Sequence, residues 1–189
     1  MKYLDLRNKI YFNIFTLLDV FKIYPEEKET SVKMQLHRLA EKRLITKIKK
    51  GVYCFDPQKI DELSLANHLY SPSYISMESA LSYYGIIPDI PLSVTSITLT
   101  TTKKIRNKFS NFFYHKIKKD LFFGYKTVES PDKTVFNIAL KEKALLDYIY
   151  IRKIPNLEDA RLSLSDFDKR IYNKFRSSFP PSVRKVRLP

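Results

Sequence analysis

The residues best suited to chemistry lie in one predicted helix near the N-terminus. A helix fits the major groove of B-DNA, where a Gln side chain can pair with adenine and an Arg side chain with guanine. We therefore predict that Gln35 and Arg38 read bases, while Lys33 and Lys42 contact phosphates. The candidate groove contacts on this helix are Ser31, Lys33, Gln35, His37, Arg38 and Lys42.

A basic hairpin is predicted directly after this helix. From Ile45 the apolar residues recur with a period of about two, and Lys50 and Gly51 form a turn before the next apolar run. Lysines at a hairpin tip can touch the DNA backbone or the minor groove. Taken alone, a solvated helix face and a lysine-rich turn would explain these features, but their ordered succession indicates DNA binding. The candidate contacts on the hairpin are Lys47, Lys49 and Lys50.

Two further basic clusters follow along the chain. They could extend a DNA footprint, bind RNA or meet an acidic protein, and solvated surface charge explains them as well. Phe112, Phe113 and Tyr114 lie beside the first and could stack on bases, although we assign them to the core. This possible secondary nucleic-acid or partner surface comprises Lys103, Lys104, Arg106, Lys108, Lys116, Lys118 and Lys119. The other cluster comprises Lys169, Arg170, Lys174, Arg176, Arg184, Lys185 and Arg187.

Composition narrows the class of protein. The 189 residues carry a formal net charge of +14, which favours nucleic acid or another anionic partner. A single cysteine, Cys54, excludes an internal disulfide and a cysteine-based zinc site. His37, His68 and His115 lack ligand spacing, so we expect neither a metal nor another cofactor. No export signal or membrane-spanning apolar run is evident, so we expect a cytoplasmic protein with no membrane partner.

Support for an enzyme is weak. Asp132, followed by Glu142 and Lys143, resembles the carboxylate pattern of metal-dependent nucleases, but the lysine falls one residue too early. We therefore assign no catalytic residues and expect no enzymatic activity. Two alternatives stay open: a nuclease-like enzyme delivered to DNA by its N-terminal domain, and an adaptor that uses that domain to bind protein.

The elements that must position the candidate residues form a winged helix-turn-helix over residues 1–58. Helices are expected over residues 5–15 and 17–23, and Thr16 with Asp19 forms a capping box between them. Thr30 or Ser31 should cap the third helix, whose buried face carries Val32, Leu36, Leu39 and Ala40. The basic hairpin then completes the domain.

Residues 59–189 are expected to form an α+β domain with an antiparallel sheet and C-terminal helices. A helix over 77–84, capped by Ser76 and ended by Gly85, precedes strands over 93–102, 111–117, 122–128 and 135–139. Another helix runs from Lys141 and stops before Pro155. The residue pairs Asn156–Asp159 and Ser165–Asp168 are plausible N-caps of two short helices. The folded part is expected to end at Pro180 and Pro181, and the residues after them to form a basic tail.

Three stretches resemble the AbiEi family of antitoxins from toxin–antitoxin and phage-defence operons. They are LAEKRLI at 39–45 running into KGVY at 50–53, SYISMESALSYYGIIP at 73–88, and EKALLD at 142–147. The resemblance implies a type IV, AbiE-like system in which a winged helix represses the protein's own operon on inverted repeats of double-stranded DNA. It also implies a C-terminal domain that counteracts a nucleotidyltransferase toxin, with no need for a stable complex.

Overall fold

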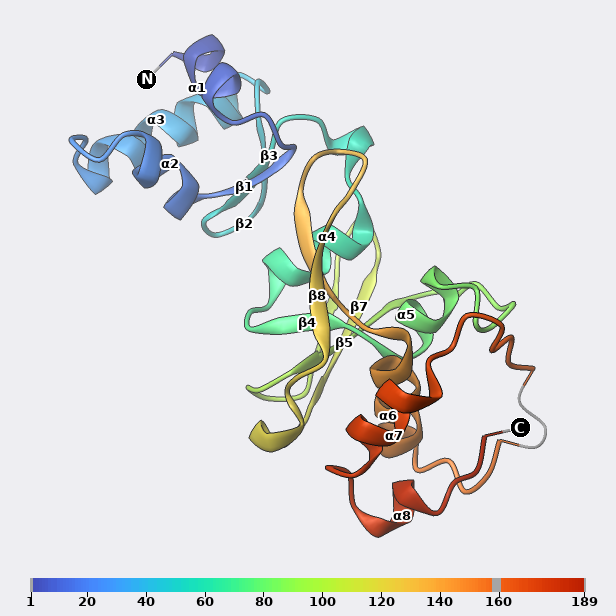
Figure 1. Cartoon of the computed structure of the whole chain (residues 1–189). Helices are drawn as coiled ribbons and strands as arrows, with labels where there is room; N and C mark the ends of the chain where they lie inside the picture. The colour runs from blue at the N-terminus through green and yellow to red at the C-terminus, as the bar shows by residue number, and fades with distance from the viewer. Residues whose placement is uncertain (1, 158–160, 189) are drawn as a thin grey trace. The chain divides into compact units, whose positions relative to one another are not determined.

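The structure is a computed structural model that describes residues 2–157 and 161–188 (Figure 1). The chain is α+β and divides into two compact units. The first comprises residues up to Leu69 together with Glu129–Val135, and the second comprises Tyr70–Val128 and the chain from Phe136 onward. The boundary expected after residue 58 therefore lies inside the first unit.

Two segments beyond residue 58 belong to this first unit because they pack on β1 or bond to the chain that leads into it. Helix α4 contacts strand β1, and the amide of Asn13 donates to the carbonyl of Asp132 at 3.1 Å. The amide of Ile14 donates to the hydroxyl of Thr134, also at 3.1 Å. The residues that these contacts join are far apart in the sequence, so no local sequence pattern predicts the contacts.

The first unit combines short helices with a three-stranded antiparallel sheet of order β1-β3-β2. Phe15 of β1 and Lys47 of β2 both lie opposite Tyr53 of β3. Buried residues Leu6, Val32 and Leu36 fill the core beside this sheet. The elements are α1 (Tyr3–Lys9), β1 (Ile14–Thr16), α2 (Leu17–Ile23), α3 (Glu29–Glu41), β2 (Thr46–Lys49), β3 (Val52–Cys54), η1 (Pro57–Lys59) and α4 (Glu62–Leu69).

Helix α2 and its capping box are confirmed, whereas the helices on either side differ from expectation. Thr16 donates from its amide to Asp19 at 2.8 Å and accepts the Asp19 amide at 3.3 Å. The predicted first helix was too long, because residues from Ile14 onward pair with β3. Lys28, with no side-chain bond, occupies the N-cap of α3, so neither Thr30 nor Ser31 caps it.

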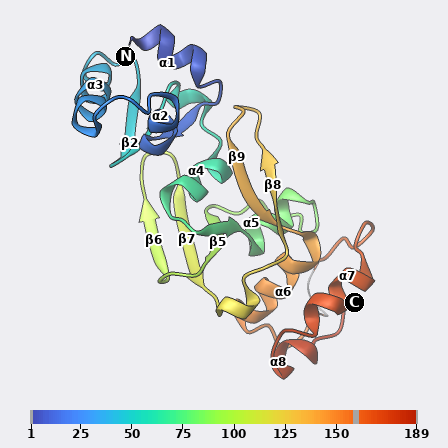
Figure 2. The same cartoon turned by 60° about the vertical axis from the view of Figure 1, so that its left-hand side comes forward.

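The second unit is built on a six-stranded sheet of order β6-β7-β5-β4-β9-β8 (Figure 2). Its strands are β4 (Ser73–Ile75), β5 (Val94–Thr98), β6 (Lys103–Arg106), β7 (Asn111–Lys116), β8 (Tyr125–Glu129) and β9 (Val135–Ala139). Its helices are α5 (Met77–Tyr83), η2 (Lys119–Leu121), α6 (Lys141–Arg152), α7 (Lys169–Arg176) and α8 (Pro181–Arg184). Helix α6 contacts α5, α7 and α8.

The sheet is mixed, which corrects the expected antiparallel arrangement. Strands β4 and β5 pair antiparallel, as do β6 and β7, but β5 with β7 and β4 with β9 are parallel. The predicted strand over 93–102 ends at Thr98, and the chain starts the separate strand β6 at Lys103. Strand β7 then returns between β5 and β6, and this insertion makes its pairing with β5 parallel.

Regular structure extends further toward the C-terminus than the sequence predicts. Asp168 alone caps α7, accepting the amides of Arg170 and Ile171, while Ser165 makes no cap. The expected basic tail contains α8, and Val183 and Val186 are buried there. The Asn156–Asp159 pair includes a residue outside the described part of the chain. No helix in the described ranges is both long and apolar enough to cross a membrane.

Candidate nucleic-acid interface

Helix α3 turns one face into the core of the first unit and the other outward. Its side chains Val32, Leu36 and Leu39 lie on the inner face and are buried among residues of α1 and α2. Because residues three and four apart share a helix face, the remaining positions point away from that core. Lys33, Met34, His37, Arg38 and Lys42 are accordingly exposed.

The exposed cations of α3 have only weak partners on the same helix. Lys33 pairs with Glu29, and His37 lies 3.4 Å from Glu41, each pair being exposed and four residues apart. Such surface pairs contribute at most about 1 kcal/mol and are readily exchanged for another anion. A guanidinium nitrogen of Arg38 lies 3.4 Å from the sulfur of Met34. These side chains can therefore turn to phosphate or base at little cost.

Gln35 does not share this freedom. Its amide nitrogen donates to Glu27 at 2.7 Å and to the hydroxyl of Ser31 at 2.9 Å. The side chain is half-buried, and its Oε1 has no hydrogen-bond partner among the described residues. Ser31 is half-buried in the same network. Base reading by Gln35, predicted from its residue type, would require these bonds to break first.

The hairpin is formed as predicted, with three lysines near its tip. Gly51 has a φ of +78°, a conformation that glycine adopts without strain. Lys47, Lys49 and Lys50 are all exposed, but the Nζ of Lys49 already donates to the backbone carbonyl of Leu69. The register of β2 against β3 shifts between Lys47, which lies opposite Tyr53, and Lys49, which lies opposite Val52. Lys47 and Lys50 are thus the better placed to meet an external anion.

Met34 is a surface residue that the sequence reasoning overlooked. Its side chain is 51% exposed, although methionine is usually buried. It lies one helical turn before Arg38, on the face opposite the buried stripe. The signal was its position outside the stripe of Val32, Leu36 and Leu39. An exposed apolar side chain beside a cation can contact the methyl group of thymine in a groove.

The basic cluster between Lys103 and Lys119 lies entirely on the second unit, and all seven of its cations are exposed. Lys103, Lys104 and Arg106 belong to the edge strand β6, and Lys108 follows it. Lys116 ends β7, and Lys118 and Lys119 lie at the start of η2. The cluster is therefore divided between the edge of the sheet and the turn after β7.

A closed polar cluster, which the sequence reasoning did not identify, lies inside the second unit. Lys143 donates to Asp147 and, at 2.8 Å, to the hydroxyl of Tyr74. Asp147 also accepts the hydroxyls of Tyr74 at 3.0 Å and Ser76 at 2.8 Å. Burial lowers the pKa of Lys143 and raises that of Asp147, and their mutual attraction opposes both changes. All four residues are buried, so the cluster has no contact with solvent.

The nuclease-like carboxylates occupy structural positions. Asp132 belongs to the first unit, where it accepts the amide of Thr134 at 3.0 Å within a turn. Glu142 belongs to the second unit, is buried, and accepts the amide of Asp168 at 2.9 Å. Within the described ranges, no three His, Cys, Asp or Glu side chains gather closely enough to hold a metal ion.

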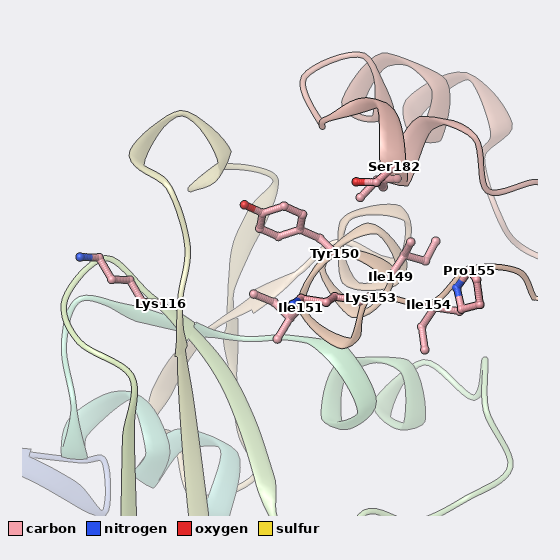
Figure 3. A pocket seen from close by; sticks show the side chains of 9 residues that line it. Lys116, Ile149, Tyr150, Ile151, Lys153, Ile154, Pro155 and Ser182 are labelled. Atoms are coloured by element: carbon pink, nitrogen blue, oxygen red, sulfur yellow. The ribbon is translucent and has the colours of Figure 1, made fainter.

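A pocket of about 640 Å³ lies between the C-terminal end of α6 and α8 (Figure 3). Its walls are mainly aliphatic, and the amino group of Lys116 points away from it. The volume suits a small molecule. The pocket offers apolar contact, but nothing in its lining selects a particular ligand. Its lining residues are Lys116, Ile149, Tyr150, Ile151, Lys153, Ile154, Pro155, Ser182 and Val183.

No protein-family model and no curated protein matches the chain in sequence. Its function is therefore inferred from the surfaces described above.

Proposed function

We propose that the chain is a DNA-binding transcriptional repressor whose first unit is a winged helix-turn-helix. Helix α3 would be the recognition helix, and the β2–β3 hairpin would be the wing. We further propose that it is an antitoxin of an AbiE-like system, which acts in the cytoplasm on the operator of its own operon.

The observation that carries the proposal is the combination of element order and outward charge in the first unit. Helices α2 and α3 are followed by an antiparallel hairpin with exposed lysines at its tip. In helix-turn-helix proteins the second helix enters the major groove while neighbouring cations hold the backbone. Arg38 and Lys33 on α3 and Lys47 and Lys50 on the hairpin supply these two kinds of contact.

The geometry favours unequal roles for the candidate residues. Arg38 is exposed and can form the bidentate bond to guanine, while Met34 beside it supplies an apolar contact. Lys33, Lys42, Lys47 and Lys50 would contact phosphates. Gln35 and Ser31 would instead position the turn before α3, because both already form hydrogen bonds with Glu27 in that turn.

Duplex binding is tested by selecting ligands for the full chain from a library of random duplexes and measuring affinity at several salt concentrations. We expect an enriched sequence arranged as an inverted repeat. Affinity should fall steeply with rising salt, because each phosphate contact releases counterions. The absence of any enriched sequence, or an affinity that does not change with salt, would refute the repressor proposal.

The antitoxin role needs a separate experiment in cells. The reading frame beside the gene is expected to encode a nucleotidyltransferase that stops growth when expressed alone. Co-expression of this chain should restore growth, and so should the variant Lys47→Ala/Lys50→Ala, since the neutralising activity is assigned to the second unit. Continued growth arrest with the wild-type chain would contradict the antitoxin role and leave the repressor role untouched.

A further inference from the structure

One edge of the six-stranded sheet is strongly basic. Between Asp89 and Asp120 the sequence contains no acidic residue, and seven lysines or arginines fall within it. The strands that this segment forms are β5, β6 and β7, of which β6 lies at the sheet edge. Cations concentrated on an edge strand discourage strand pairing between copies, which is the ordinary explanation for them. The aromatic residues among them point to a more specific role.

Lys104, Arg106 and Phe113 share one face of this edge. Lys104 lies directly opposite Phe113, and Arg106 lies opposite Asn111. Because alternate residues of a strand point to the same side, His115 is on this face as well. Burial lowers the pKa of His115, and the positive charges of Arg152 and Lys104 lower it further.

Two aromatic rings, Phe113 on this face and Phe109 in the turn between β6 and β7, are accompanied by ammonium groups. The Nζ of Lys104 lies 5.2 Å from the ring centre of Phe113, and that of Lys108 lies 5.0 Å from Phe109. Both rings are half-buried, unlike Phe112, which is fully buried. A half-buried ring has a fixed position and an accessible part, as stacking on a base requires.

We propose that this β6–β7 surface, defined as Lys104, Arg106, Lys108, Phe109 and Phe113, binds single-stranded nucleic acid. The cations would contact successive phosphates, and the two rings would stack on bases. A duplex hides the faces of its bases and would use the cations alone, and an acidic peptide would likewise leave the rings unused. The surface belongs to the second unit, so this activity goes beyond the proposed operator binding and does not depend on it.

The test measures binding of the full chain to labelled 15-nucleotide oligothymidylate and oligouridylate by fluorescence anisotropy at several salt concentrations. The variant Lys104→Ala/Arg106→Ala should bind roughly tenfold more weakly. Its plot of log affinity against log salt should be shallower by about 1.4, since each phosphate contact to a single strand contributes about 0.7. The control Lys169→Ala/Arg170→Ala removes equal charge from the exposed start of α7 and should bind like wild type.

A second variant isolates the stacking. Phe113→Leu keeps an apolar side chain at a half-buried site, so thermal unfolding should change little while single-strand affinity falls several-fold. The salt dependence should stay as in wild type, because no cation is lost.

Three outcomes would overturn the proposal. The first is no single-strand binding by the wild-type chain. The second is an equal loss in the α7 control, which would indicate a non-specific effect of net charge. The third is binding of a polyglutamate peptide in preference to the oligonucleotides, with no effect of Phe113→Leu, which would indicate an acidic protein partner. Selection of a duplex operator is independent of all three, so the two proposals can fail separately.

Discussion

Lys143 and Asp147 form an ion pair one helical turn apart on α6, and neither side chain has any exposed area. Tyr74 and Ser76 complete the hydrogen bonds of Asp147 from β4 and the residue after it. The stretches 73–88 and 142–147 therefore meet at this pair. The hydrogen bonds that join the two stretches therefore lie in the buried interior of the second unit.

Removing only the cation of this pair should destabilise the second unit strongly. Lys143→Met leaves the Asp147 carboxylate buried without its counter-charge, which typically costs about 3–5 kcal/mol. The double variant Lys143→Met/Asp147→Asn removes both charges and keeps an oxygen that accepts from Tyr74 and Ser76. Its free energy of unfolding in urea should recover most of the loss. A double variant no more stable than the single one would contradict a charge-based role.

His115 should make stability depend on pH in a defined direction. Burial depresses its pKa below the ordinary value of 6.5, so the unfolded chain binds a proton more readily than the folded one. The contribution of the neutral His115 to folding stability is therefore complete above pH 6.5, and it is lost as the pH falls through the pKa of His115 in the folded state. Thermal unfolding should be measured from pH 7.5 to pH 5, a range that brackets the ordinary histidine pKa of about 6.5. Over this range the melting temperature of wild type should fall more steeply than that of His115→Gln. Parallel curves for the two proteins would refute this.

Gly124 and Gly85 provide a matched pair of substitutions. Both have positive φ values, +71° and +67°, so alanine costs about 1–2 kcal/mol of backbone strain at either position. At Gly124 a Cβ would also lie 3.1 Å from the ring of Phe175 and 3.2 Å from Lys143, whereas nothing lies within 4 Å at Gly85. Gly124→Ala should therefore lower the melting temperature more than Gly85→Ala. Equal effects would show that the packing around Lys143 yields easily.

Much of the fold was predictable wherever neighbouring residues determine it. The capping box of Thr16 and Asp19 places the start of α2, and the apolar spacing of α3 predicts its buried face. Partners distant in the sequence overrode local preference at β1, where Ile14 pairs with Cys54. The same reason explains the mixed sheet, since the parallel pairing of β5 with β7 depends on where a later strand inserts.

The candidate site was predictable in its outline and less so in its details. Exposure of Lys33 and Arg38 follows from helix periodicity alone. The engagement of Gln35 does not, because its partner Glu27 lies in the turn before α3, eight residues earlier. The buried cluster was harder still, since Ser76 and Asp147 are separated by 71 residues.

The central claim, that α3 reads DNA, is tested most directly by the ratio of affinities for the selected operator and a scrambled duplex of equal length. Arg38→Ala should weaken operator binding by about 1–3 kcal/mol and leave the scrambled duplex nearly unchanged, so the ratio falls. Arg38→Lys should restore charge but not the ratio, because an ammonium cannot make the bidentate bond. Lys47→Ala should weaken both duplexes alike. An Arg38→Ala protein that keeps the wild-type ratio would contradict the assignment of α3 as the recognition helix.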